Sequence, residues 1–232
     1  MKIYLSPSMQ KANLYAVGGT NEQVQCNRIA RAAETALRRC GFEVKKAPEG
    51  QSMENNVAES NAWGADLHIP IHTNAGGGRG CVVFIAQASP ERMNVAQAIY
   101  DEIDAITLYK SVYGVREKLF YEVRNTKGLC AYTECEFHDD PELAQWIINN
   151  AEALGEAICR GVCKAAGVKY IPEENEEMER WKTIDDVPQG YRKMVQNYID
   201  KGALAGKKDG SIDLTEDMVR VMEIMRRYFE EE

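Results

Sequence analysis

The stretch LHIPIHTNAGG (residues 67–77) joins an apolar run to two imidazoles, His68 and His72, and then breaks into polar residues and glycine. A short apolar run of this length predicts a buried strand, and the glycines that follow predict a turn. His72 and Asn74 therefore stand at the carboxyl end of a core strand. An imidazole at this position is expected either to have a hydrogen-bond partner or to serve a function.

The segments around this strand predict an α/β fold, with a mainly parallel twisted sheet flanked by helices, because short apolar runs alternate with helical patterns. Asn21 is the expected N-cap of the first helix, and Gly41 its stop. The further strands are expected at KIYL (2–5), FEVKKA (42–47), GCVVFIA (80–86) and LCAYTECEF (129–137). The helices are expected over 21–40, 53–63, 89–106 and, as one long helix, 140–167.

Length and composition favour a globular protein. The 232 residues are 44% hydrophobic, and no apolar run is long enough to span a membrane. The start, MKIYLSPSMQ, lacks the pattern of a secretion signal, so we expect synthesis in the cytoplasm. The seven cysteines are an odd number without a CxxC pair, and we expect them to be reduced and to pack as small hydrophobes.

The charge is concentrated near the end of the chain. Of the net charge of −8, residues 171–232 carry −6, from 10 basic and 16 acidic residues. Such a field repels nucleic acid, which we exclude as a partner. We expect three parts: a domain over 1–170, an acidic linker over 171–180, and a helical module over 181–232. The module has helical patterns at 188–201 and at 215–229, with Thr215 as N-cap.

Several polar side chains are expected at one rim of the sheet, because the carboxyl ends of parallel strands meet there. Glu22 opens the first helix, His72 and Asn74 end the histidine strand, and Glu134 lies near the end of the AYTE segment. Carboxylate and imidazole are suitable zinc ligands. A carboxylate within an apolar strand, as at Glu134, is expected to have a raised pKa unless it is paired.

This order of residues resembles the zinc-dependent N-acetylmuramoyl-L-alanine amidases of the amidase-3 type over about residues 1–169. The matching positions are Glu22 opening the first helix, His72 with Asn74 in a His-x-Asn context, and Glu134 before Phe137 in place of the family's Glu-x-Gly-Phe. Two positions depart from the pattern. Ser6-Pro7-Ser8-Met9 stands where the family has Asp-Pro-Gly-His, so the first ligand histidine is absent, and Glu136 replaces the family glycine.

The resemblance implies a zinc ion held by Glu22 and His72, with Glu134 as the general base. The third ligand is expected to be either His138 or Gln10, since Met9 offers only a soft thioether. Asn74 either binds substrate or only shapes the turn. His68 is expected to be satisfied within the sheet. Glu122 could reach the same face as these residues, but a pair with Arg124 or another surface cation is favoured.

The implied activity is hydrolysis of the amide bond between N-acetylmuramic acid and L-alanine in peptidoglycan. We expect a phage or prophage endolysin-like enzyme that acts at the bacterial cell wall after release, without a membrane partner. The alternative is an impaired amidase-fold protein that binds the wall or serves as a scaffold.

The module over 181–232 resembles a single S-layer-homology-like repeat. It is expected to form a homodimer, to pack against the domain over 1–170, or to bind the wall directly. The residues expected to contact sugars are Trp181, Tyr191 and Tyr198, and those expected to pair helices are Val219, Met222 and Met225.

Overall fold

The computed structural model describes residues 1–173, 180–207 and 211–230, and the chain forms two compact units, Met1–Glu173 and Glu174–Glu232. Most of the expected acidic linker, residues 174–179, lies outside the described residues. Each unit has its own hydrophobic core. None of the described helices is both long enough and apolar enough to cross a membrane.

The first unit is built on one sheet with the strand order β2-β1-β3-β7-β4-β5, and β6 pairs with β3. All pairings are parallel except the one between β4 and β7, so the predicted mainly parallel sheet is confirmed. The strands are β1 (Lys2–Pro7), β2 (Glu43–Lys46), β3 (Leu67–Asn74), β4 (Val82–Ile85), β5 (Val115–Glu117), β6 (Leu129–Cys130) and β7 (Tyr132–Phe137).

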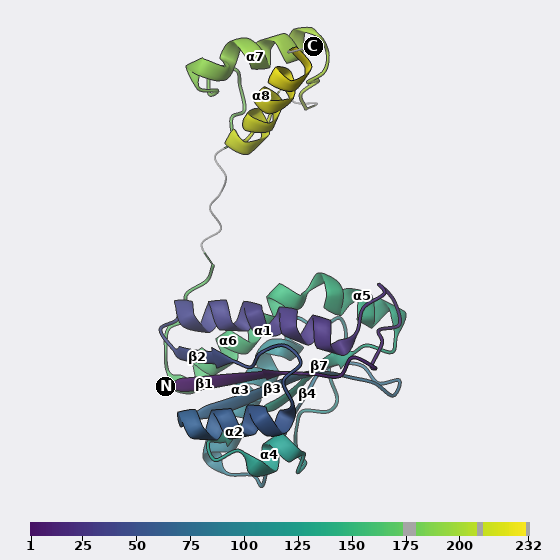
Figure 1. The fold of residues 1–232 in the computed structure, drawn as a ribbon, viewed down its shortest axis with the longest axis vertical. Helices are drawn as coiled ribbons and strands as arrows, with labels where there is room; N and C mark the ends of the chain where they lie inside the picture. Colours follow the sequence, from purple (N-terminus) through teal and green to yellow (C-terminus); the bar gives the residue numbers. More distant parts are fainter. Residues whose placement is uncertain (174–179, 208–210, 231–232) are drawn as a thin grey trace. The chain divides into compact units, whose positions relative to one another are not determined.

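Helices cover both faces of this sheet (Figure 1). The helices are α1 (Glu22–Arg39), α2 (Met53–Trp63), α3 (Pro90–Asp104), α4 (Tyr121–Asn125), α5 (Pro141–Asn149) and α6 (Ala151–Ala166). Helices α1 and α6 lie on one face, whereas α2 and α4 lie on the other. The larger core lies on the α1 and α6 side, where α3 also contributes Ile99 and Ile103.

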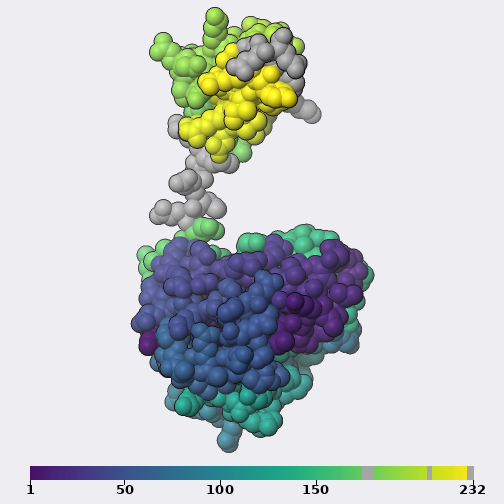
Figure 2. Space-filling view, in the orientation of Figure 1, coloured from purple at the N-terminus to yellow at the C-terminus, as the bar shows by residue number. Residues whose placement is uncertain are grey.

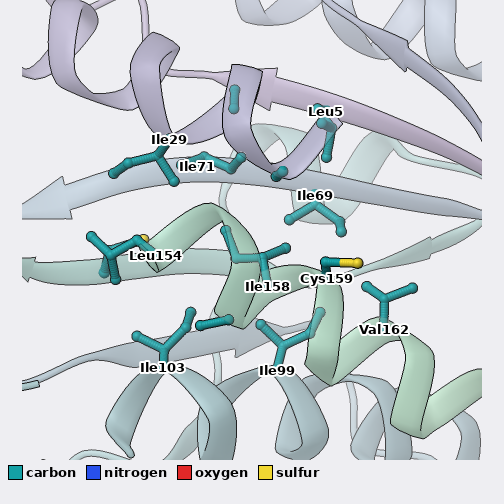
Figure 3. Packing of buried hydrophobic residues seen from close by; sticks show 14 of the residues in the cluster. Leu5, Ile29, Ile69, Ile71, Ile99, Ile103, Leu154, Ile158, Cys159 and Val162 are labelled. Carbon is teal, nitrogen blue, oxygen red and sulfur yellow. The ribbon is translucent and has the colours of Figure 1, made fainter. Parts of the chain in front are cut away.

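Strand β3 divides its side chains between the two faces, as the period of two in a strand requires. Leu67, Ile69 and Ile71 enter the large core, where they face side chains of α1, α3 and α6 (Figure 3). The alternate residues, His68 and His72, consequently point to the face that α2 and α4 cover. The alternation in LHIPIH thus places the imidazoles on the more polar side of the sheet.

Helix boundaries followed the sequence signals in most places. Asn21 caps α1, since its side chain accepts a hydrogen bond from Val24 N at 3.1 Å. The single helix expected over 140–167 is wrong, because Asn150 leaves the helical conformation with φ −120° and ψ 19° and separates α5 from α6. Its side-chain amide instead donates to the carbonyl of Trp146 at 2.8 Å, as asparagine does at helix ends. The strand expected over 129–137 is divided into β6 and β7, and the short elements β5 and α4 were not expected.

The second unit contains α7 (Gln189–Asp200) and α8 (Glu216–Glu230), close to the helices that the sequence predicts. Thr215 caps α8 through a hydrogen bond from Met218 N at 3.3 Å. The core of the unit consists of Trp181, Val187, Met194, Val195, Leu214 and Val219. Helix α8 forms much of the visible face of this unit (Figure 2, yellow).

The close approach of α1 and α6 gives a test of the large core. A Cβ atom added to Gly155 would lie 2.5 Å from Ala32 Cβ and 2.6 Å from Ala33 N, so Gly155→Ala must push the helices apart. We expect the first unit to lose about 1–3 kcal/mol of unfolding free energy, measured by urea denaturation. Gly190→Ala in α7 is the control, because nothing lies within 4 Å of its added Cβ. Equal stability of Gly155→Ala and wild type would contradict this packing.

Candidate active site

The site centres on a short contact between His72, near the end of β3, and Glu22, the first residue of α1. His72 Nδ1 lies 2.7 Å from Glu22 Oε1. Both side chains are buried, with 8% of His72 and 1% of Glu22 exposed. The Asn21 cap fixes where α1 begins, and so it fixes Glu22 at the carboxyl end of the sheet.

The protonation of this pair follows from its surroundings. Burial opposes ionisation of Glu22, but hydrogen bonds from His72, Asn13 and Ser8 and the charge of His72 outweigh it and lower the pKa of Glu22. Burial likewise opposes the imidazolium, yet the Glu22 hydrogen bond and the charges of Glu134, Glu22 and Glu122 raise the pKa of His72. Three carboxylates around one imidazole leave an excess of negative charge, which favours a bound cation.

Gln10 is the third polar side chain at this contact. Its Nε2 lies 3.4 Å from His72 Nδ1, and its Oε1 accepts a hydrogen bond from Asn13 Nδ2 at 2.8 Å. The same Asn13 amide donates to Glu22 Oε2 at 2.6 Å. Asn13 therefore ties Gln10 and Glu22 together.

Glu134 lies beside His72 on the neighbouring strand. The parallel register of β3 and β7 pairs His72 with Glu134, so both side chains point to the same face. Glu134 Oε2 is buried without a hydrogen-bond partner among the described residues. Burial and the charge of Glu22 outweigh the attraction of His72 and Lys118 and raise the pKa of Glu134 to about 7. A carboxyl group with that pKa can both take and return a proton near neutral pH.

The structure does not bring His138 to this site. Its Nδ1 lies 2.9 Å from Thr73 Oγ1, and its ring stacks on Tyr15 at 5.0 Å. Thr73 directly follows His72 in the strand and so points to the opposite face. Of the two expected third ligands, Gln10 alone lies beside the Glu22–His72 pair.

Asn74 ends β3 next to the glycine loop. Its Oδ1 accepts a hydrogen bond from Ala75 N at 2.9 Å, so the side chain shapes the turn. The loop is held further by Asp139, which accepts hydrogen bonds from Gly76 N and Gly77 N at 2.7 and 2.8 Å. Glu136, at the position of the family glycine, is buried and accepts from Gly80 N at 2.5 Å. Glu136 therefore anchors the loop. None of its hydrogen bonds within the described part of the chain reaches Glu22 or His72.

The surface pairing favoured for Glu122 is wrong, whereas the alternative, that it reaches the face of the site, is confirmed. The side chain is 3% exposed and forms no ion pair with Arg124; its partners are Ser6 and the two histidines of β3. Glu122 lies on the short helix α4, whose weak helical pattern did not favour burial. The apolar residue Val123 beside it, in FYEVRNT, was the one hint that this segment is buried.

A pocket of about 460 Å³ opens beside His72. Its polar lining includes Gln10, His72 and Glu122, and its apolar lining includes Phe120, Tyr121 and Tyr132. The Tyr132 ring stacks on His72 at 4.6 Å and fixes the imidazole plane. The arrangement suits a ligand that has both polar and apolar groups.

Glu22, His72 and Gln10 have a donor set that fits zinc. Tetrahedral bonds of about 2.0–2.1 Å require ligand atoms roughly 3.3 Å apart. The amide nitrogen of Gln10, which does not ligate zinc, lies 3.4 Å from His72 Nδ1, and the Glu22–His72 separation of 2.7 Å must widen slightly. A half-turn of the Gln10 amide would bring its oxygen, the ligating atom, to the place of this nitrogen, and it would break the hydrogen bond from Asn13.

A second group of possible ligands lies in the large core. The sulfur atoms of Cys40, Cys159 and Cys163 all lie within 4.8 Å of one another. Burial raises the pKa of the Cys163 thiol to about 11 and that of Cys159 well above its usual range. All seven cysteines are buried free thiols. Cys40, Cys159 and Cys163 all belong to the large hydrophobic core, which is consistent with a packing role.

Comparisons with known proteins identify the family and the fold of the first unit. A family model described as N-acetylmuramoyl-L-alanine amidase matches residues 4–164. No curated protein matches the chain. Among solved structures, the chain is similar to the N-acetylmuramoyl-L-alanine amidase AmiC2 of Nostoc punctiforme, with 16% identity and a TM-score of 0.65, over 72% of this chain and 97% of that one.

Two further structures are similar. The N-acetylmuramoyl-L-alanine amidase from Clostridium difficile 630 has 20% identity and a TM-score of 0.66, over 72% of this chain and 97% of its own. The catalytic domain of the CD27L endolysin, which targets Clostridia difficile, has 21% identity and a TM-score of 0.59, over 74% and 98%. At these identities the likeness establishes a common fold.

The raised pKa of Glu134 predicts how the stability of the zinc-free protein depends on pH. A carboxyl group whose folded pKa is raised stabilises the fold below its unfolded pKa of 4.5, and this stabilisation is lost as pH rises through about 7. Glutamine does not ionise, so the Glu134→Gln variant does not lose this stabilisation as the pH rises. In urea unfolding, the variant should therefore gain stability relative to wild type between pH 5 and pH 8. A constant difference across that range would show that the Glu134 pKa is not raised.

Proposed function

The chain belongs to the family of N-acetylmuramoyl-L-alanine amidases, and on this premise we propose that its first unit cleaves the amide between N-acetylmuramic acid and L-alanine in peptidoglycan with zinc held by Glu22, His72 and Gln10. The observation that carries the proposal is Glu134, a carboxyl group with a pKa of about 7 in register with His72. A buried carboxyl oxygen that serves only to stabilise the fold is expected to have a hydrogen-bond partner. Glu134 Oε2 has none among the described residues, which supports a catalytic role.

Zinc and Glu134 have different roles in the proposed reaction. Zinc, when bound, supplies polarisation of a water molecule and of the amide carbonyl. Glu134 accepts a proton from the attacking water, and the water oxygen bonds to the carbonyl carbon. Glu134 then returns the proton to the nitrogen of L-alanine as the carbon–nitrogen bond breaks. The products are a free amine on the peptide and a carboxylate on the muramic acid.

The pocket beside His72 is the proposed site for the substrate around the scissile bond. Phe120, Tyr121 and Tyr132 offer apolar surface to the lactyl and alanyl groups, and Gln10 offers hydrogen bonds. Asn74 remains a proposed substrate contact through its amide nitrogen, because its oxygen is occupied by the turn.

The absent first histidine favours the impaired-protein alternative, whereas three features support an active site. Gln10 lies where it can replace the lost ligand, Glu22 and His72 keep their contact, and Glu134 keeps its raised pKa. An amide oxygen is a weaker zinc ligand than an imidazole, so the proposed enzyme needs a higher zinc concentration than a site with two histidines.

The proposed place of action is the bacterial cell wall. The similarity to the catalytic domain of an endolysin supports a lytic role of that kind, in which the enzyme is made in the cytoplasm and reaches the wall upon lysis.

Zinc binding and cleavage should separate in two variants. Glu134→Gln should bind zinc as wild type does but lose at least 100-fold in cleavage of a soluble muropeptide, because the variant lacks the base and keeps every proposed ligand. Gln10→Ala should weaken zinc binding by 10-fold or more and regain cleavage when zinc is raised. Zinc content by elemental analysis and peptide-amine release measure the two effects.

A core variant provides the control. Cys159→Ser removes one of the three clustered thiols and should leave both zinc content and cleavage unchanged. Full cleavage by Glu134→Gln would refute its role as base. Loss of zinc in Cys159→Ser with retention in Gln10→Ala would move the metal to the thiols.

For the second unit we propose self-association through α8. Val219 is buried in the core of its own unit and Met222 packs against that core, so the expected pairing stripe of Val219, Met222 and Met225 is wrong in its first two members. The exposed hydrophobic residues of the described part of α8 are instead Met218, Val221, Ile224, Met225 and Tyr228. The spacing of three and then four from Met218 through Val221 to Met225 is typical of paired helices.

A second copy fits this face better than the wall does. Residues 171–232 carry a net charge of −6, which disfavours anionic wall polymers and also opposes a second copy, so the charge does not decide between the two partners. The side chains expected to contact sugars are also engaged within the unit, because Trp181 is buried and Tyr191 and Tyr198 pack against the same core. Antiparallel pairing of α8 would place Glu216 near Arg227 of the partner's helix.

Truncation and a point variant test this role. We expect the full chain to sediment as a dimer, and both Met225→Glu and a chain of residues 1–173 to sediment as monomers. All three should cleave soluble muropeptide at equal rates, because the candidate site lies within the first unit. A monomeric full chain that still needs the second unit to bind cell walls would favour wall binding instead.

A further inference from the structure

One buried carboxylate on the histidine face of the sheet has no part in the proposed chemistry. Glu122, on α4, is 3% exposed, and its ion-pair partners among the described residues are two histidines of the same strand. Its Oε1 lies 3.2 Å from His68 Nε2, and its Oε2 lies 3.9 Å from His72 Nε2. Burial of a carboxylate is costly unless its oxygens are satisfied.

The contacts of Glu122 hold one oxygen firmly and leave the other facing His72. Ser6 Oγ donates to Oε1 at 2.5 Å, and Asn56 Nδ2 donates to Ser6 Oγ at 2.8 Å. The His68 ring that contacts Oε1 is itself fixed by stacking on Tyr4 at 5.3 Å and 3°. Oε1 is thus anchored by β1 and β3, and this directs Oε2 toward the imidazole of the site.

His72 has a carboxylate on each side of its ring. Nδ1 faces Glu22 and Gln10, whereas Nε2 faces Glu122. One metal ion binds only one of the two nitrogens, so Glu122 is not placed to share a cation with Glu22 through this ring. A carboxylate at the second nitrogen of a ligating histidine fixes the tautomer and the direction of the ring.

We propose that Glu122 is a positioning residue that accepts a hydrogen bond from Nε2–H of His72 and so keeps Nδ1 directed at Glu22 and Gln10. This inference rests on the proposed function. The 3.9 Å separation is an electrostatic contact, and a hydrogen bond requires an approach of about 1 Å. The role also accounts for the second imidazole of the strand, since His68 holds the carboxylate that orients His72.

The test compares zinc affinity among matched variants of the full chain, measured by competition with a chromophoric chelator. Glu122→Gln keeps an oxygen to accept from Ser6 and His68 but can present an amide N–H to His72, so zinc affinity should fall 10- to 100-fold. Glu59→Gln is the control, because Glu59 binds the Tyr4 hydroxyl at 2.7 Å on the same side of the sheet and does not contact His72. Ser6→Ala, which frees Oε1, should give a smaller loss.

A spectroscopic measurement separates positioning from mere structural support. In the zinc-loaded wild type, the Nε2–H proton of His72 should give a hydrogen-bonded NMR signal, which Glu122→Gln should lose while Glu59→Gln keeps it. Unchanged zinc affinity and an unchanged signal in Glu122→Gln would overturn the positioning role, even if Glu22→Gln loses zinc. If Glu22→Gln binds zinc like wild type, the proposed zinc site itself is wrong, and the inference falls with it.

Discussion

The contact between His72 and Glu22 is the constraint on which the candidate site depends. It joins the end of a core strand to the start of the first helix, and both groups are almost fully withdrawn from water. At such depth an imidazole can be retained only with partners. The surrounding residues meet this requirement, with Glu22 and Gln10 at one nitrogen, Glu122 near the other, and Tyr132 against the ring.

Much of the fold around this contact could be predicted from the sequence. The period of two in LHIPIH separates Ile69 and Ile71 from His68 and His72, and the structure places these pairs on opposite faces. The Asn21 cap set the start of α1 within one residue. The break at Asn150 was missed because the apolar pattern continues through it, and only the local backbone shows that the two helices are separate.

The site was predictable where its residues end regular elements. Glu22 and His72 stand at or near an element's end, and the rule that such ends converge predicts that they meet. Glu134 is the third residue of β7, and its pairing with His72 brings it to the same place. His138 lies four residues after Glu134, so alternation alone predicts the same face for both. The β3–β7 register shifts by one residue between the His72–Glu134 and Asn74–Phe137 pairs, and His138 contacts Thr73 instead. The sequence left the position of Glu122 open between the site and the surface, because a five-residue helix carries almost no periodic signal, and tertiary contacts show that it is buried.

The central claim is that this amidase-family chain binds zinc with an amide, a carboxylate and a single imidazole. Crystals of the full chain grown with an equimolar amount of zinc, with diffraction recorded at the zinc absorption edge, test it most directly. The account predicts one anomalous peak bonded to Glu22, to Nδ1 of His72 and to the side-chain oxygen of Gln10. A peak among Cys40, Cys159 and Cys163, or one at Nε2 of His72 beside Glu122, would contradict it.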